Sequence, residues 1–365
     1  MSNRFSGFDN RPFAITAPDA PSELTAITSS AEGVGTFRPS TPLGLNQMKT
    51  FQVRGLSSPP ATSTAPGEPE PLVRKLTLTS GYDTNPSTAG DADGSPVGAA
   101  AFSAQYTFGR NYDASLETYE QSLSVGYTFA ASIFDGSQDE NDEIDHELAV
   151  EYFRRWGGRD AEGNATDVFD LTADVTNTLI MIDWKTQLYV LELSPTLAYH
   201  PTPDSTIGLT YSFQWLDFDA AGNNQDRHTG GLQLAKSFES DQAAGEVFIA
   251  ASHVWNQAEA DAADWDANQV SVGVRQLRFW NARDLPATLS LKYTVQWRDY
   301  SSADRDDVVQ GVELAGGLSL AKWIKVAEGQ KLNALLKYNC NWVSSDLDAA
   351  EYEQHIVLVG ISYQF

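Results

Sequence analysis

The last residues of the chain, His355-Ile-Val-Leu-Val-Gly-Ile-Ser-Tyr-Gln-Phe365, alternate in character up to the C-terminus. Successive side chains of a β-strand point to opposite faces. One face of this segment therefore carries Val357, Val359, Ile361, Tyr363 and Phe365. The other face carries Ile356, Leu358, Gly360, Ser362 and Gln364. The pattern predicts a terminal strand with one continuous apolar face.

The same period of two recurs through the chain from about residue 72. It is clear in residues 101–108, 123–129, 207–215 and 289–297, where apolar residues alternate with Gly, Ser, Thr, Gln and Lys. We expect about fourteen strands, each long enough to cross a bilayer at a tilt. The expected ranges are 72–82, 98–109, 118–132, 145–156, 166–179, 184–200, 204–218, 228–240, 244–257, 267–280, 285–299, 308–323, 329–343 and 353–365. The two ranges from 228 to 257 alternate poorly, so the count carries a margin of two strands.

Residues 1–70 differ in composition from the rest. They are rich in Pro, Ser, Thr, Ala and Gly, and proline at this density opposes both helix and central strand. We expect an extended arm or linker over 1–70 and a strand domain over 71–365. Two interpretations of this arm remain open. It is a plain linker, or it is a segment that binds a partner or plugs the barrel.

Three features favour a barrel in lipid over a soluble sandwich. The apolar faces end in aromatic residues, such as Tyr211 to Trp215 and Tyr293 to Trp297, as expected for interfacial girdles. The opposite faces are polar, as expected for a wet interior. Evenly spaced strands over nearly 300 residues would make an unusually large sandwich. We therefore predict an all-β fold: a closed antiparallel transmembrane β-barrel, since closure satisfies every backbone group in lipid.

Loop lengths indicate the orientation of such a barrel. Short connections near 200–204, 239–242, 281–284 and 328–330 are expected on the periplasmic side, together with the C-terminus. The longer connections 219–226, 257–266 and 299–307 are expected outside. An even strand count then places the N-terminal arm in the periplasm. Two connections fit this scheme badly, because 157–166 is long and the link near Ile182 is short.

Charge and motif content exclude several functions. The net charge of −25 argues against nucleic acid as a partner. The acidic segment 135–145 is interpreted as a solvated loop, or as a cation-binding loop at a lipopolysaccharide surface. There is one cysteine, Cys340, so neither a disulfide within the chain nor a cysteine metal cluster is expected. No cofactor or metal motif is present, and no local signal marks an enzyme, although a Ser/His pair is an alternative.

The charges on the predicted inner faces are the candidate pore-lining residues. They are Lys75, Glu147, Glu151, Arg155, Asp170, Asp174, Glu192, Arg275, Lys292, Arg298, Glu313 and Lys337. In a closed barrel they predict an acidic wall on the fourth to sixth strands. A more basic wall would run from the tenth to the fourteenth strand and into the first. Such walls would set up a transverse field in an open pore. Alternatively, the charges pair across the lumen and plug it.

Two segments carry a resemblance to known proteins. The terminal strand ending in Phe365 resembles the sorting signal of bacterial outer-membrane proteins. That resemblance implies recognition by the barrel-assembly machinery and location in the outer membrane of a Gram-negative bacterium. Leu76-Thr-Leu-Thr-Ser-Gly-Tyr-Asp-Thr-Asn-Pro86 resembles the first strand of a group of porin-like β-barrels associated with exopolysaccharide loci. A strand-ending turn explains the Asn and Pro equally well.

An exported barrel needs a signal peptide, which residues 1–8 do not provide, so we expect the gene's upstream sequence to encode one.

These observations lead to two principal hypotheses. In the first, the protein is a passive outer-membrane pore for small hydrophilic solutes, or is related to polysaccharide export. In the second, it is an anchoring component that binds a periplasmic or surface partner through the 1–70 arm and the acidic loops. Outer-membrane lipid and lipopolysaccharide are expected partners of the barrel under both hypotheses. A hydrolase in the lumen or at the rim is a third, weaker alternative.

Overall fold

The structure is a computed structural model that describes 72–84, 95–113, 118–134, 142–158, 167–182, 185–219, 224–240, 243–259, 264–279, 287–301, 305–321, 323–327, 330–346 and 351–365. The arm expected over 1–70 lies outside the described residues, as does most of the acidic segment 135–145. Within these ranges, no helix has the length and hydropathy needed to cross a membrane.

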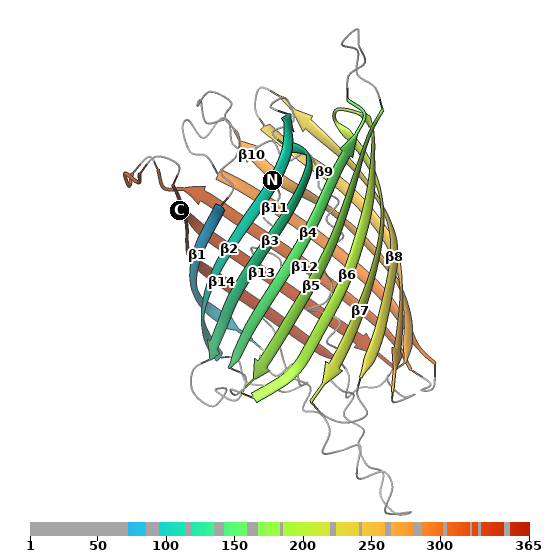
Figure 1. Ribbon diagram of the computed structural model, residues 1–365. Helices are drawn as coiled ribbons and strands as arrows, with labels where there is room; N and C mark the ends of the chain where they lie inside the picture. Colours follow the sequence, from blue (N-terminus) through green and yellow to red (C-terminus); the bar gives the residue numbers. More distant parts are fainter. Residues whose placement is uncertain are drawn as a thin grey trace, which may run out of the picture.

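The described residues form fourteen antiparallel strands that close into one barrel, with the first strand hydrogen-bonded to the last (Figure 1). The strands are β1 Leu72–Asp83, β2 Ser95–Asp113, β3 Thr118–Phe134, β4 Glu143–Trp156, β5 Val168–Ile182, β6 Lys185–Thr202, β7 Ser205–Phe218, β8 Gln225–Glu239, β9 Ala243–Ala258, β10 Trp265–Phe279, β11 Ala287–Tyr300, β12 Asp306–Ser319, β13 Lys331–Ser345 and β14 Tyr352–Gln364. Each strand pairs with its sequence neighbours, so successive strands form hairpins. The predicted fold and strand count are confirmed.

Some predicted strand boundaries were wrong, and the errors fall on charged residues. β8 begins at Gln225 and β10 at Trp265, where the sequence predicted outer loops. β4 begins at Glu143, and Glu143 and Asp145 are buried. The end of the acidic segment is therefore strand and not solvated loop. Acidic residues such as Glu143 and Asp145 have a low strand propensity, but they can occupy inward-facing strand positions near the end of a barrel.

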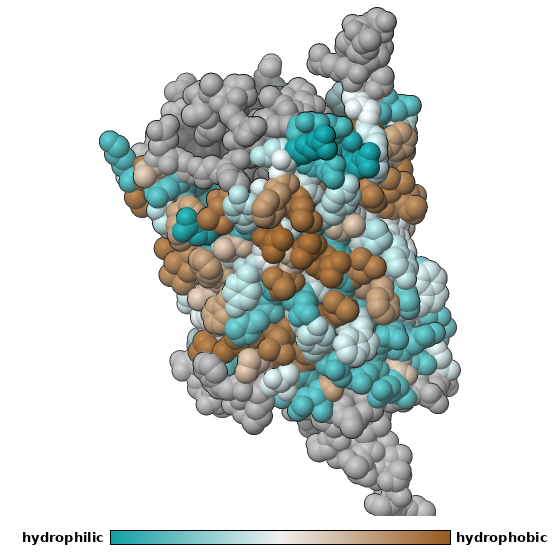
Figure 2. Space-filling model, viewed as in Figure 1, coloured by the Kyte–Doolittle hydropathy of each residue, from teal (hydrophilic) through white to brown (hydrophobic). Residues whose placement is uncertain are grey.

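The two faces of the wall differ in the way that the alternation predicted. Large apolar side chains are exposed on the outside, and polar ones are buried on the inside. Leu209, for example, is 60% exposed, whereas its neighbour Thr210 is buried. Figure 2 shows apolar side chains gathered across the middle of the outer surface. A patch of this extent on a soluble monomer would be exceptional. In lipid it is the surface that a spanning barrel requires.

Aromatic residues border this apolar surface near both ends of the barrel. We call the end where β1 begins and β14 finishes the termini end, and the other the opposite end. Exposed outward aromatics near the termini end are Tyr106, Phe108, Trp156, Phe169, Phe238 and Phe365. Those toward the opposite end are Tyr82, Tyr127, Tyr211, Trp215, Trp255, Tyr293 and Trp297. Two girdles of this kind mark the two interfaces of a bilayer.

The seam between β1 and β14 closes the wall. At the termini end, the backbones of Arg74 and Phe365 exchange hydrogen bonds of 3.2 and 2.9 Å. The Arg74 guanidinium also lies 5.4 Å from the centre of the Phe365 ring, a cation–π contact. At the opposite end, the buried Gln354 amide donates to both carboxylate oxygens of buried Asp83, at 3.1 and 3.0 Å. The C-terminal residue is therefore an integral part of the closed wall.

Two glycines permit the close approach of the backbones at this seam. A Cβ atom on Gly360 would lie 2.0 Å from the carbonyl oxygen of Leu78. A Cβ atom on Gly81 would lie 1.7 Å from the carbonyl oxygen of Val357. Both contacts are with backbone atoms, which cannot rotate away. Glycine is needed at these positions because strand meets strand here without room for a side chain.

Candidate functional site: the barrel interior

The inner face of the wall is where the predicted functional residues lie. Each predicted pore-lining charge occupies an inward-facing position of its strand, by alternation with neighbouring buried residues. Most of these side chains are buried, so the interior is densely occupied around them. Their placement follows from the period of two. Their contact with a passing solute stays a prediction.

On the acidic wall, Arg155 and Asp170 are opposite each other on β4 and β5. The guanidinium donates two hydrogen bonds of 2.6 Å to the carboxylate, in bidentate geometry. His200 Nε2 on β6 lies 3.0 Å from the same carboxylate, and His200 Nδ1 lies 3.1 Å from the hydroxyl of Thr206 on β7. The network joins four consecutive strands. A bidentate, charge-assisted pair is the strong form of such a contact.

This network contains a carboxylate, an imidazole and a hydroxyl, the groups of a hydrolytic triad. Asp170, His200 and Thr206 are all buried, and Asp170 is already held by Arg155. A nucleophile must reach its substrate, and this hydroxyl is buried. We therefore assign the network a structural role in holding β4 to β7 together.

The basic wall also pairs its charges between neighbouring strands. Lys292 forms an ion pair with Glu313, its register partner on β12. Arg275 forms an ion pair of 2.8 Å with Glu246, its register partner on β9. The sequence pattern did not identify Glu246, because β9 alternates poorly around it. These pairs run along the wall and do not cross the lumen, which differs from the predicted plugging arrangement.

A further departure concerns β14. This strand, described from Tyr352 to Gln364, has no charged side chain on its inner face. Its buried Ile356 and Leu358 pack instead with Val97, Ala99 and Ala101 of β2, in a small apolar cluster inside the barrel. The predicted basic wall is therefore interrupted by an apolar sector at the closing seam. Alternation had already assigned Ile356 and Leu358 to one face of this strand, so the absence of a basic side chain on it could have been read from the sequence.

Two arginines near the opposite end form the most distinctive feature of the interior. The guanidiniums of Arg227 and Arg298 lie 5.2 and 4.8 Å from the Trp265 ring centre. Arg227 donates to the side-chain amides of Asn256 at 3.0 Å and Gln225 at 3.4 Å. Among the described residues, no carboxylate lies within ion-pair distance of either guanidinium. Both guanidiniums contact neutral groups and an aromatic face, and the Glu192 carboxylate also interacts electrostatically with Arg227.

Arg298 has hydrogen-bonding capacity left over. Its Nε donates to Gln296 at 2.7 Å, while its buried Nη2 has no hydrogen-bond partner among the described side chains. Its register partner Asp307 is occupied by a bidentate pair with Arg305, at 2.8 and 2.5 Å. Arg298 was predicted from the sequence. Arg227 was missed because its strand was expected to begin at residue 228; its alternation with Thr229 and Gly231 was the signal that pointed inward.

The five histidines all lie on strands. His200 lies inside the barrel, in the network described above. The other four lie on strands, on the outer surface, toward the opposite end: His146, His228, His253 and His355. Three of them accept or donate a hydrogen bond with a tyrosine of the preceding strand, at 2.7–2.9 Å. The fourth, His253, lies 2.9 Å from the Asn268 side chain.

Comparison with known proteins gives a likeness of fold. No protein-family model matches the sequence, and no curated protein matches it. An outer-membrane channel from Pseudomonas putida F1 matches with a TM-score of 0.42 and 10% identity, over 83% of this chain and 99% of that chain. A BenF-like porin from Pseudomonas fluorescens Pf-5 matches with a TM-score of 0.39 and 11% identity, over 82% and 100%. An anion-selective porin from Comamonas acidovorans matches with a TM-score of 0.36 and 12% identity, over 80% and 98%.

Proposed function

We propose that the protein forms a narrow, charge-lined pore for small hydrophilic solutes in the bacterial outer membrane. The observation that supports this most directly is the contrast between the two faces of one closed wall. The outer face carries an apolar surface bordered by aromatic girdles, and the inner face carries buried charges. Apolar packing would stabilise a purely structural barrel equally well, so stability alone does not account for the number of buried charges.

The charges define the selectivity that we expect of the pore. Ion pairs such as Lys292–Glu313 largely cancel their own fields. Neither Arg227 nor Arg298 forms a salt bridge with a described carboxylate, although the Glu192 carboxylate partly offsets the charge of Arg227. In a confined, low-dielectric passage such a charge attracts anions and repels cations. We propose that these two arginines favour solutes with an anionic group, such as a carboxylate.

Electrophysiology tests this proposal. Purified protein in planar bilayers should open small, discrete channels, and a potassium chloride gradient should give a reversal potential on the anion-selective side. The double variant Arg227→Gln/Arg298→Gln should shift the reversal potential toward cation selectivity. Arg154→Gln is the matched control, because Arg154 is exposed on the outer surface, 5.1 Å from the Trp156 ring. If no channel opens at any voltage, the protein does not form a pore. If the double variant leaves the reversal potential unchanged, the two arginines do not set the selectivity.

The anchoring hypothesis stays as a second proposal for residues 1–70. Because the strand count is even, the arm leaves β1 at the same end as the C-terminus. If that end faces the periplasm, the arm is placed to contact a periplasmic protein or the assembly machinery. Affinity purification with and without residues 1–70 tests this role. An identical set of captured proteins would argue against it.

A further inference from the structure

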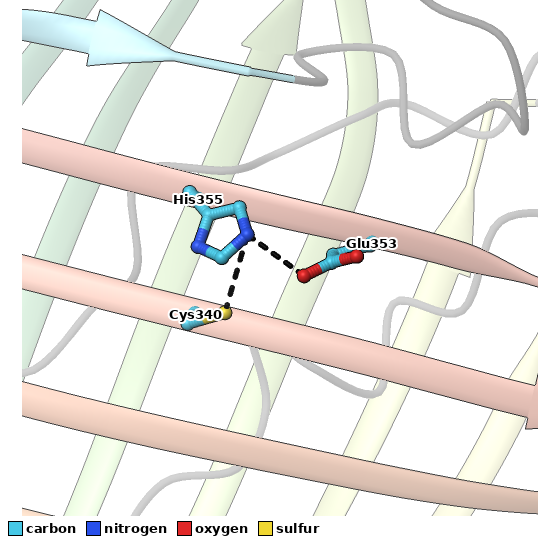
Figure 3. A group of neighbouring side chains, drawn as sticks. All are labelled: Cys340, Glu353 and His355. Carbon is cyan, nitrogen blue, oxygen red and sulfur yellow. Dashed lines mark hydrogen bonds and ion pairs between the residues drawn. The ribbon is translucent and has the colours of Figure 1, made fainter.

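The outer surface of the last hairpin gathers three potential metal ligands. Cys340 on β13 is the register partner of His355 on β14, and Glu353 precedes His355 by two residues on the same face. His355 Nε2 lies 3.8 Å from Cys340 Sγ and 2.8 Å from Glu353 Oε1. The three ligand atoms all lie within 4.8 Å of one another. Figure 3 shows the Cys340 thiol and the Glu353 carboxylate on either side of the same ring nitrogen of His355.

Neighbouring side chains orient two of these ligands. The Tyr338 hydroxyl lies 2.9 Å from His355 Nδ1, the nitrogen that faces away from the cluster. In the metal-bound state Nδ1–H would donate to that hydroxyl, and the lone pair of Nε2 would be directed at the metal between the thiol and the carboxylate. Trp342 Nε1–H donates to Glu353 Oε1 at 2.9 Å. Outer hydrogen bonds of this kind are the usual means by which proteins fix the ligands of a metal.

The same barrel provides internal comparisons. Tyr127 and His146, on β3 and β4, form the same diagonal pair, but Phe129 occupies the position that corresponds to Cys340. On β7 and β8, Tyr211 and His228 repeat the pair, again with a phenylalanine opposite the histidine. A tyrosine–histidine pair is therefore a recurrent element of this girdle. Among these three hairpins, the last one alone adds a thiol.

We propose that Cys340, Glu353 and His355 bind a divalent transition metal ion, with Zn²⁺ as the best match. Thiolate, imidazole and carboxylate are the three ligand types that zinc accepts, and three protein ligands leave one position open. Pairs of ligand atoms around a tetrahedral zinc lie about 3.4–3.6 Å apart. The Sγ–Nε2 distance of 3.8 Å is close to that value. The shorter Nε2–Oε1 contact is a hydrogen bond, which the metal would replace.

Access to the site is from outside the barrel. Glu353 is exposed and His355 is half-buried, whereas Cys340 lies beneath them. All three residues lie toward the opposite end, within the aromatic girdle and not in the middle of the apolar surface. An ion can therefore approach through the headgroup region without crossing hydrocarbon. The site is separate from the interior and does not depend on the proposed pore.

Cobalt binding tests the proposal, because Co²⁺ replaces Zn²⁺ and reports a thiolate ligand by a charge-transfer band. Full-length protein, folded in detergent and stripped of metal, should bind one Co²⁺ per chain, develop this band, and lose it when Zn²⁺ is added. Cys340→Ser should abolish the band. Glu353→Gln, at an exposed position, should weaken Zn²⁺ affinity at least about tenfold, and Tyr338→Phe about tenfold.

The matched control is His228→Gln, which removes a histidine of the same girdle that has the same tyrosine partner but no thiol opposite it. It should bind Co²⁺ as the unsubstituted protein does. Tryptophan fluorescence in detergent verifies that each variant is folded. No thiolate band in the folded protein, or equal Zn²⁺ affinity in the Glu353→Gln variant, would overturn the proposal.

Discussion

Substitution of Gly360 by alanine should open the closing seam of the barrel. The added methyl group would lie 2.0 Å from the Leu78 carbonyl oxygen and 2.7 Å from the Thr79 Cα atom. Real Cβ atoms essentially never approach other heavy atoms closer than 3.0 Å, so the two strands must separate by about 1 Å. Gly360 and Thr79 are register partners, so the movement strains the ladder hydrogen bonds beside them.

The size of the effect follows from those hydrogen bonds. Leaving a buried backbone group unsatisfied costs about 1–3 kcal/mol, and more in hydrocarbon. With two groups affected, we expect Gly360→Ala to lower the free energy of unfolding by about 2–6 kcal/mol. Urea titration of the protein in lipid vesicles, followed by tryptophan fluorescence, measures this change as a lower midpoint at an unchanged slope.

Gly98 provides the matched control for this experiment. It lies on β2, and a Cβ atom there would meet nothing within 4 Å. Gly98→Ala should therefore change the unfolding free energy by less than about 0.5 kcal/mol. If both variants unfold at the same urea concentration as the unsubstituted protein, the close approach at the seam is not required for closure, and the reasoning fails.

Two further substitutions probe the inside and the outside of the wall. Arg155→Ala leaves the Asp170 carboxylate buried without its bidentate partner, so we expect a loss of about 3–5 kcal/mol in the same urea titration, with partial recovery in Arg155→Lys. A loss below about 1 kcal/mol would mean that water reaches Asp170 freely. Leu209→Arg places a charge on the apolar outer surface, and we expect it to destabilise the barrel in vesicles by about 2–4 kcal/mol. A charge on a water-exposed face would be harmless, so unaltered stability in lipid would contradict the membrane-facing assignment.

The number of strands and the direction of each side chain could be predicted from the sequence. Both depend on a local rule, because a strand alternates its faces whatever its neighbours are. For this reason alternation alone places Lys75 and Arg298 inside the barrel and Val357 outside. The rule failed where alternation was weak, as at Glu246, or where a strand extended past its apolar residues, as at Arg227.

Which side chains meet was decided by tertiary structure alone. Register between strands depends on loop geometry and on the closure of the barrel, neither of which is encoded in a period of two. Closure brings Asp83 to Gln354, and register places Cys340 opposite His355 and Arg155 opposite Asp170. The sequence therefore determined that charges line the interior. Pairing between adjacent strands, a property of the assembled wall, determined which of those charges are neutralised by a neighbour.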